Sequence, residues 1–344
     1  MIKKDTSTTS RKADHIQINL DNDIRSDLAT GLEKLHFIHQ ALPEIDLDDV
    51  EISQQLFGKH LTAPILISSM TGGTQNAAEL NRILASAANE TGIAIGLGSQ
   101  RAAIENPSLE NTFKVRQYAP NALLLANLGA VQLNMGYGIE ECQKAVDMIE
   151  ADGLILHLNP LQEALQPEGD TKFMGLLKKI CDVCKALPVP IIIKEVGWGI
   201  SGQVARMLAE AGVTAIDVAG AGGTSWSQVE MYRNLDPYLA KIAGNFRDWG
   251  IPTVDSIRMV KQNAPNMQIF ASGGLSNGID IAKCLALGAS LGGVAGPFLR
   301  AADVSYEHLV NTIQAISREI RICLFATGKS NLKKFDNSVL IEGK

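Results

Sequence analysis

The sequence has no long apolar run. Nowhere do about 18 consecutive uncharged apolar residues occur, which is the length that a membrane-spanning helix requires. The stretch from Met1 to His15 also lacks the hydrophobic segment that a secretion signal contains. We therefore expect a cytoplasmic protein that does not enter a membrane.

The sequence also has no excess of basic residues. Its 31 lysines and arginines are outnumbered by 37 aspartates and glutamates, so the formal net charge is -6. Proteins that bind nucleic acids usually carry an excess of positive charge. The composition therefore argues against a nucleic-acid partner, and any anionic ligand must be neutralised by local side chains.

Cysteines are few and irregularly spaced. The chain has five, two of which form a Cys181-x-x-Cys184 pair. A zinc site would need a second pair, or two histidines at ligand spacing, and neither follows. All five fall in segments of helical pattern, and we expect them to be reduced thiols that pack in the core. They are Cys142, Cys181, Cys184, Cys284 and Cys323.

The chain does contain a repeat of short β-branched runs and longer amphipathic segments. Its 344 residues, 46% of them hydrophobic, are enough to bury a large core. Eight apolar runs alternate with segments of helical period, which is typical of βα units in a parallel sheet. An open doubly wound sheet is the alternative, but eight consecutive units favour an α/β fold of the closed (β/α)8 TIM-barrel type. The expected strands are 65–69, 94–98, 122–127, 153–158, 190–195, 215–219, 268–272 and 291–295.

The segments between and after these runs have apolar residues at three- and four-residue steps, which predicts helices. About fifty residues separate the sixth strand from the seventh. A connection this long is usually an inserted lid or binding loop, and Gly222, Gly223 and Trp226 fit that role. The expected helices are 75–91, 140–151, 171–187, 202–211, 254–262, 277–287 and 304–327.

We expect the chain to have three parts. Residues 1–60 would form an N-terminal arm that packs on the barrel, residues 61–330 the barrel, and residues 331–344 a C-terminal tail. Within the arm, the amphipathic stretch 31–42 predicts a short helix. Arg11, Lys12 and His15 form a basic cluster, for which a solvated, frayed terminus is the alternative reading.

Polar residues collect where the expected strands end. In a (β/α)8 barrel the loops after the strands build the active site. After the fourth run, His157, Asn159, Gln162 and Glu163 occur within seven positions. This pattern indicates an active-site rim, with an ordinary surface loop as the alternative.

Two glycine-containing strand ends are suited to phosphate binding. Ser272-Gly273-Gly274 and Ala295-Gly296 would expose backbone N–H groups near the start of a helix. Lys194 ends an apolar strand, so its ammonium should point into the barrel mouth and stabilise an anionic ring system. A solvent-exposed lysine is the alternative. Together these features predict flavin mononucleotide (FMN), whereas Gly96-x-Gly98-x-x-Arg101 lacks the third glycine of a dinucleotide site.

Read in order, these motifs resemble the type 2, FMN-dependent isopentenyl-diphosphate delta-isomerase family, whose members are FMN-binding (β/α)8 barrels with an N-terminal extension. The His157-x-Asn159-x-x-Gln162-Glu163 stretch, together with the basic arm, distinguishes this family from other FMN barrels. The motifs that carry the resemblance are Arg11-Lys12-x-x-His15, Met70-Thr71-Gly72-Gly73, Gly98-Ser99-Gln100-Arg101, His157-x-Asn159-x-x-Gln162-Glu163, Lys194-Glu195-Val196-Gly197-x-Gly199, Gly222-Gly223-Thr224-Ser225-Trp226, Ser272-Gly273-Gly274 and Ala295-Gly296.

The resemblance implies an isomerase that interconverts isopentenyl diphosphate and dimethylallyl diphosphate in isoprenoid biosynthesis. It implies reduced FMN and Mg2+ as cofactors, NADPH as the expected reductant, and a homo-oligomer that is a tetramer or larger. An unactivated alkene is a poor base, and the family uses the reduced flavin to handle the protons without net redox change. The diphosphate and its metal would then be held by the polar rim.

The resemblance also implies roles for individual residues. The implied catalytic residues are Gln162, Lys194 and His157. The implied substrate-binding residues are Arg11, Lys12, His15, Ser99, Gln100, Arg101, His157, Asn159 and Gln162, and the implied magnesium ligand is Glu163. The implied FMN contacts are Ser69, Met70, Thr71, Ser99, Asn127, Lys194, Thr224, Gly273, Gly274, Ala295 and Gly296. For His157, the alternative is a histidine that satisfies backbone groups in the barrel core.

Two other functions compete with the isomerase. An oxidase of the α-hydroxy-acid type would use the same phosphate cradle and Lys194, but it needs a catalytic histidine late in the barrel. No histidine lies between His157 and His308. A flavin-storing or regulatory protein without catalysis is the third possibility. It leaves four residues without a role, namely Arg11, Arg101, Gln162 and Glu163.

Overall fold

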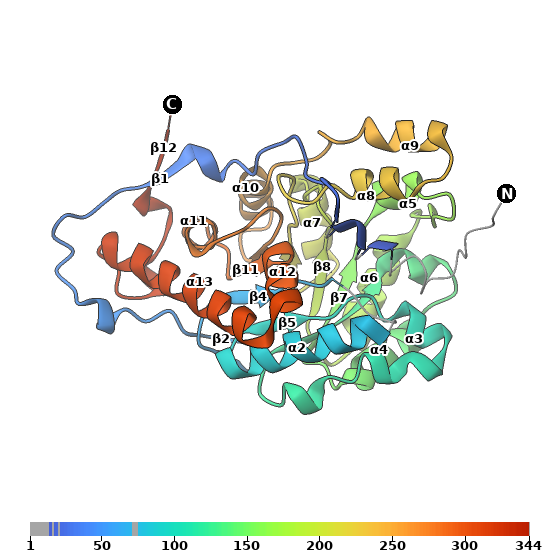
Figure 1. Ribbon diagram of the computed structural model, residues 1–344, viewed down its shortest axis with the longest axis horizontal. Coiled ribbons are helices and arrows are strands. Elements are labelled where there is room, and N and C mark those ends of the chain that lie inside the picture. The colour runs from blue at the N-terminus through green and yellow to red at the C-terminus, as the bar shows by residue number, and fades with distance from the viewer. Residues whose placement is uncertain (1–13, 16, 20, 71–74, 344) are drawn as a thin grey trace.

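The centre of the molecule is a closed barrel of eight parallel strands surrounded by helices (Figure 1). The structure is a computed structural model, and it describes residues 14–15, 17–19, 21–70 and 75–343. The strands follow one another around the barrel in chain order, and β11 closes onto β4. Each strand overlaps one of the predicted runs, so the (β/α)8 prediction is confirmed. The barrel strands are β4 (Ile65–Ile67), β5 (Ala94–Gly96), β6 (Leu124–Gly129), β7 (Gly153–His157), β8 (Ile191–Lys194), β9 (Ala215–Asp217), β10 (Gln268–Ala271) and β11 (Leu291–Val294).

The predicted helices are confirmed, and the structure adds shorter ones. The helices that correspond to predictions are α2 (Gln75–Thr91), α4 (Ile139–Ile149), α6 (Leu176–Ala186), α7 (Gly202–Glu210), α10 (Thr253–Asn263), α11 (Gly278–Ala286) and α13 (Tyr306–Ala326). The additional ones are α3 (Arg101–Glu105), α5 (Pro160–Leu165), α8 (Trp226–Arg233), α9 (Pro237–Gly244) and α12 (Gly296–Val304). Within the described part of the chain, no helix has the length and apolarity needed to cross a membrane.

The helix predicted for residues 31–42 is wrong. A short 3-10 turn, Leu32–Lys34, leads into strand β1 (Leu35–Phe37), which pairs antiparallel with β12 (Leu340–Glu342). The apolar spacing of this stretch is compatible with both a helix and a strand. Pairing with β12, from the far end of the chain, stabilises the strand. Strand β1 of the arm and strand β12 of the tail therefore lie side by side (Figure 1).

The connection between the sixth and seventh barrel strands is also more ordered than predicted. The sequence predicts an inserted loop here, but the connection contains helices α8 and α9, which lie beside α5 (Figure 1). The buried face of α8 includes Ser227, Gln228 and Glu230. Because these buried residues are polar, apolar periodicity gave no sign of a helix.

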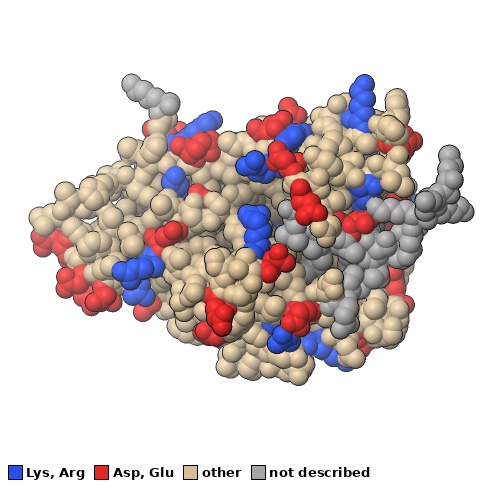
Figure 2. All heavy atoms as spheres, viewed as in Figure 1, with Lys and Arg blue, Asp and Glu red and all other residues tan. Residues whose placement is uncertain are grey.

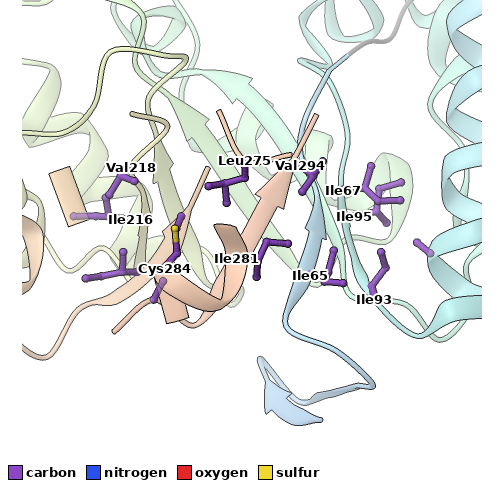
Figure 3. Packing of buried hydrophobic residues seen from close by; sticks show 14 of the residues in the cluster. Ile65, Ile67, Ile93, Ile95, Ile216, Val218, Leu275, Ile281, Cys284 and Val294 are labelled. Carbon is purple, nitrogen blue, oxygen red and sulfur yellow. The ribbon is translucent and has the colours of Figure 1, made fainter. Parts of the chain in front are cut away.

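The core has two layers that share the barrel strands. Alternate strand residues such as Ile65 and Ile67 point outward and pack against the helices (Figure 3). Residues between them, such as Leu66, point inward and form a second cluster. The hairpin of β2 (Gln54–Leu56) and β3 (Lys59–Leu61) adds Leu56 and Leu61 to that inner cluster. Packing on both faces fixes the strands and therefore the position of the residues that follow them.

The five cysteines all lie in helices and carry free thiols, as predicted. Cys142, Cys284 and Cys323 are buried, whereas Cys181 and Cys184 on α6 are half-buried. The remaining short 3-10 turns connect elements, and one of them, Ala130–Asn134, places Gln132 at the wall of the smaller cavity described below. They are Leu47–Asp49, Pro107–Thr112, Arg116–Tyr118, Ala130–Asn134, Leu332–Lys334 and Asn337–Val339.

Candidate active site

Two adjoining cavities open where the barrel strands end. The larger has a volume of about 660 Å³ and lies over the ends of β8 to β11 and β4. The smaller has a volume of about 150 Å³ and lies over the ends of β5 to β8. Both are bordered by Ser69, Met70 and Lys194, so the two spaces share a wall. The polar rim predicted from the sequence therefore lies in the barrel mouth.

Glycines make up much of the wall of the larger cavity, among them Gly273, Gly274 and Gly296. Gly273 has a φ of +104°, and a side-chain carbon added there would lie 2.1 Å from the carbonyl oxygen of Gly220. A carbon added to Gly223 would lie 2.5 Å from the backbone nitrogen of Gly274. Only glycine allows these loops to pack so closely, and their backbone therefore borders the cavity directly. Gly273 and Gly274, which the sequence predicts as part of a phosphate cradle, thus lie at the cavity wall.

Lys194 lies inside the barrel mouth and is only 7% exposed. Its Nζ donates a hydrogen bond of 2.6 Å to Oδ2 of Asp217 and one of 2.8 Å to Oγ of Ser272. Ser272 in turn donates to Oδ1 of Asp217 over 2.6 Å. The alternative of a solvent-exposed lysine is therefore wrong. Asp217, at the end of β9, was missed, although a carboxylate ending an apolar strand is a signal of the same kind as Lys194.

His157 lines the smaller cavity, and its Nδ1 lies 2.9 Å from Oδ1 of Asn127. Asn127 is held from behind by Gln100, whose Oε1 accepts the Asn127 backbone N–H. Gln100 is fully buried and donates its amide to the carbonyl of Ala145. The structure thus places Gln100 behind the cavity wall, unlike the implied substrate contacts Ser99 and Arg101, which line the smaller cavity.

Glu163 lies in α5 with its carboxylate at the smaller cavity. Oε1 accepts a 2.9 Å hydrogen bond from Asn159, and Oε2 accepts one of 2.7 Å from the backbone of Asp170. Oδ1 of Asn159 is buried and has no partner among the described residues. Where the structure describes the chain, no cluster of three His, Cys, Asp or Glu could hold a metal ion. A cation here would thus rely on Glu163, this amide oxygen, water and ligand oxygens, which is the coordination that Mg2+ tolerates.

Gln162 is held at both ends of its amide. Its Oε1 accepts from Asn159 over 3.1 Å, and its Nε2 donates to Oε1 of Glu230 over 3.2 Å. Glu230 is 1% exposed and also contacts His15, at 3.2 Å, and Arg233, at 2.8 Å. Glu230 and Arg233 were missed because they lie in α8, where the sequence indicated a loop.

The basic side chains of the site are mostly paired with acids. Arg101 contacts Asp170 at 2.9 Å and Glu105 at 2.7 Å. His15, in the arm, packs edge-on against Trp226 with ring centroids 5.0 Å apart. Thr224, Ala295 and Gly296 line the larger cavity as expected. Three of the implied site residues, Arg11, Lys12 and Thr71, lie outside the described residues.

Comparison with known proteins gives close relatives over nearly the whole chain. A protein from Synechocystis sp. named isopentenyl-diphosphate delta-isomerase is 55% identical over 327 residues, which cover 95% of this chain and 94% of that protein. Proteins of the same name from Nostoc sp. and Rickettsia rickettsii are 52% and 50% identical, and the alignments cover 96% and 97% of this chain and 95% and 97% of theirs. The chain belongs to the isopentenyl-diphosphate delta-isomerase family. The family resemblance predicted from the motifs is thereby confirmed.

This isomerase family member also matches the model of the FMN-dependent dehydrogenase family over residues 158–342. Among solved structures, a flavocytochrome b2 variant with pyruvate bound has a TM-score of 0.68 at 17% identity, covering 95% of this chain and 82% of that one. A chimera of (S)-mandelate dehydrogenase has a TM-score of 0.67 at 15% identity, covering 96% and 99%. These structures share the fold, and the family model indicates FMN as the cofactor.

The larger cavity fits FMN on its own features. A volume of about 660 Å³ is in the range of small-molecule sites. Ser69 Oγ is buried beside it with no hydrogen-bond partner among the described residues, so a ligand polar atom would satisfy it. The glycine wall suits the phosphate, and Lys194 suits an anionic ring. On the face shown in Figure 2, acidic and basic residues are interspersed, and neither sign of charge dominates the surface.

Glu195 shapes the wall next to Lys194. One oxygen of its carboxylate, Oε2, accepts the backbone N–H groups of Val196, Gly197 and Trp198 at 2.7, 2.8 and 2.6 Å. Val196 and Gly197 line the larger cavity. Burial raises the pKa of Glu195 to about 7, and the three N–H donors offset only part of that effect.

This pKa predicts how stability depends on pH. Between about pH 4.5 and 7 the folded protein retains a proton on Glu195 that the unfolded chain has lost. The free energy of unfolding therefore falls as the pH rises through this window, by about 3 kcal/mol. Glutamine does not titrate, so Glu195→Gln should gain stability relative to the native protein between pH 5 and pH 8. Urea unfolding of both proteins measures this, and a difference that does not change with pH would contradict it.

Proposed function

We propose that the protein interconverts isopentenyl diphosphate and dimethylallyl diphosphate, as the names of its relatives state for them, in isoprenoid biosynthesis. The observation that carries the proposal is the pair of adjoining cavities. One has a glycine wall and the other a polar rim, and Lys194 borders both. A flavin in the first and a diphosphate in the second would place the reacting carbons beside the ring.

The larger cavity would hold FMN, which when reduced supplies the proton chemistry and an electron-rich ring. Lys194 would lie against the ring, because Asp217 and Ser272 fix its ammonium in the mouth. Its positive charge would favour an anionic ring. The proposed contacts are Ser69, Met70, Thr71, Ser99, Asn127, Lys194, Thr224, Gly273, Gly274, Ala295 and Gly296.

The smaller cavity would hold the diphosphate and its Mg2+. Glu163 is the proposed metal ligand, with phosphate oxygens and water completing the coordination. Gln100 would act from behind the wall by fixing Asn127. The proposed substrate contacts are Arg11, Lys12, His15, Ser99, Arg101, His157, Asn159 and Gln162.

Gln162, His157 and Lys194 are the proposed catalytic residues. Two hydrogen bonds fix the orientation of the Gln162 amide. Its oxygen faces Asn159 and its nitrogen faces Glu230. A fixed amide can orient a hydrocarbon tail and a proton donor without being charged itself. His157 would stand over the same space, oriented by Asn127.

Oxidation of a 2-hydroxy acid is the less favoured function. It requires a histidine on a late barrel loop, and the one late histidine of the sequence, His308, is exposed in the first turn of α13. His308 borders neither cavity. The isomerase therefore accounts better for the polar rim.

The direct test is conversion of isopentenyl diphosphate by purified protein under anaerobic conditions with FMN, Mg2+ and a reductant. We expect conversion with NADPH or dithionite and none while the flavin stays oxidised. Product analysis by gas chromatography after phosphatase treatment measures it. Absence of conversion with fully reduced flavin would contradict the proposed function. Conversion in the reaction with dithionite but not in the reaction with NADPH would contradict NADPH as the reductant.

Glu163→Gln tests the metal assignment. The amide keeps the size of the side chain but removes the charge, so the Mg2+ concentration for half-maximal activity should rise about tenfold or more. The FMN content should not change, because Glu163 does not line the larger cavity. Glu140→Gln, an exposed residue of α4, is the control and should titrate like the native protein. A native metal titration for Glu163→Gln would remove Glu163 from the metal site.

We also propose a homo-oligomer, a tetramer or larger, in the cytoplasm. Large apolar side chains around α9 support an interface, because Leu235, Tyr238 and Trp249 are more than half exposed in the single chain. The free thiols suit a reducing compartment. Light scattering after size exclusion should give a mass of at least four chains of 36.9 kDa. A single-chain mass would contradict the oligomer.

A further inference from the structure

Arg300 is an exposed arginine at the edge of the larger cavity. It belongs to α12, whose first residue is Gly296. A side-chain carbon placed on Gly296 would lie 3.2 Å from Nη1 of Arg300. The guanidinium is therefore folded back over the start of its own helix, and Gly296 leaves the space for it.

This position is electrostatically unfavourable in the absence of an anion. The start of a helix carries partial positive charge, so a cation there is destabilised. Other cations of the same wall have carboxylate partners: Lys194 contacts Asp217 at 2.6 Å, and Arg25 contacts Asp23 at 3.1 Å. Among the described residues, Arg300 has no ion pair. A positive charge at a positive helix end, beside a cavity, is an arrangement that a bound anion would stabilise.

We propose that Arg300 binds the phosphate group of FMN and covers it on the solvent side. This inference rests on the proposed function of the larger cavity as the flavin site. The backbone of Gly273 and Gly274 would contact the phosphate from within, and the guanidinium would offer two parallel N–H donors from outside. The acidic chain as a whole does not attract a dianion, so a local arginine gives the charge that the glycine wall lacks.

The phosphate itself provides the test, because riboflavin has the same ring system without it. The full-length chain, freed of flavin, is titrated with FMN or with riboflavin, and quenching of flavin fluorescence gives the Kd. For Arg300→Ala we expect the Kd of FMN to rise about tenfold or more and that of riboflavin to change less than about twofold. Arg300→Lys keeps the charge and should recover part of the loss. In Arg300→Ala the Kd of FMN should also respond less to salt.

The control is Arg318→Ala, which removes an exposed arginine of α13 that lines neither cavity. It should bind both flavins like the native chain. Equal losses for FMN and riboflavin in Arg300→Ala would overturn the proposal, because they would indicate a general effect on the fold. An unchanged Kd of FMN, with or without a higher KM for isopentenyl diphosphate, would overturn it as well. If the native chain bound no FMN, both the proposed function of the cavity and the proposed role of Arg300 would be overturned.

Discussion

The hydrogen bonds among Lys194, Asp217 and Ser272 are the constraint on which the barrel mouth depends. They join the ends of three neighbouring strands. Lys194 is the last residue of β8, Asp217 is the last residue of β9, and Ser272 directly follows β10. A buried ammonium is costly unless a carboxylate and further hydrogen bonds compensate it, and here both are present. The same bonds that stabilise the charge also fix its position, so the wall shared by the two cavities has one geometry.

The sequence predicted the barrel well because its signals were local. Most strands are apolar on both faces, as in residues Ile191 to Ile193 of β8. Several are followed by an amphipathic helix such as α7, so the change from strand to helix period could be predicted. Lys194 and Glu163 could be placed in the mouth because, in a (β/α)8 barrel, the residues at and after the strand ends form the mouth.

The sequence could not predict features that depend on partners far along the chain. Glu230 and Arg233 are buried against Gln162 and the arm, and their helix has a polar buried face without an apolar pattern. Gln100 lies next to Ser99, yet Ser99 lines the smaller cavity, whereas Gln100 is fully buried and binds Asn127 and Ala145. Proximity in sequence therefore did not imply a shared site.

The pairing of β1 with β12 has a consequence for how the chain matures. During synthesis the strand Leu35–Phe37 emerges early, but its partner is complete only after residue 342 has been made. The barrel can close before then, because all of its strands lie between residues 65 and 294. The arm that brings His15 to Glu230 is thus anchored through β1 only after every barrel strand has been made.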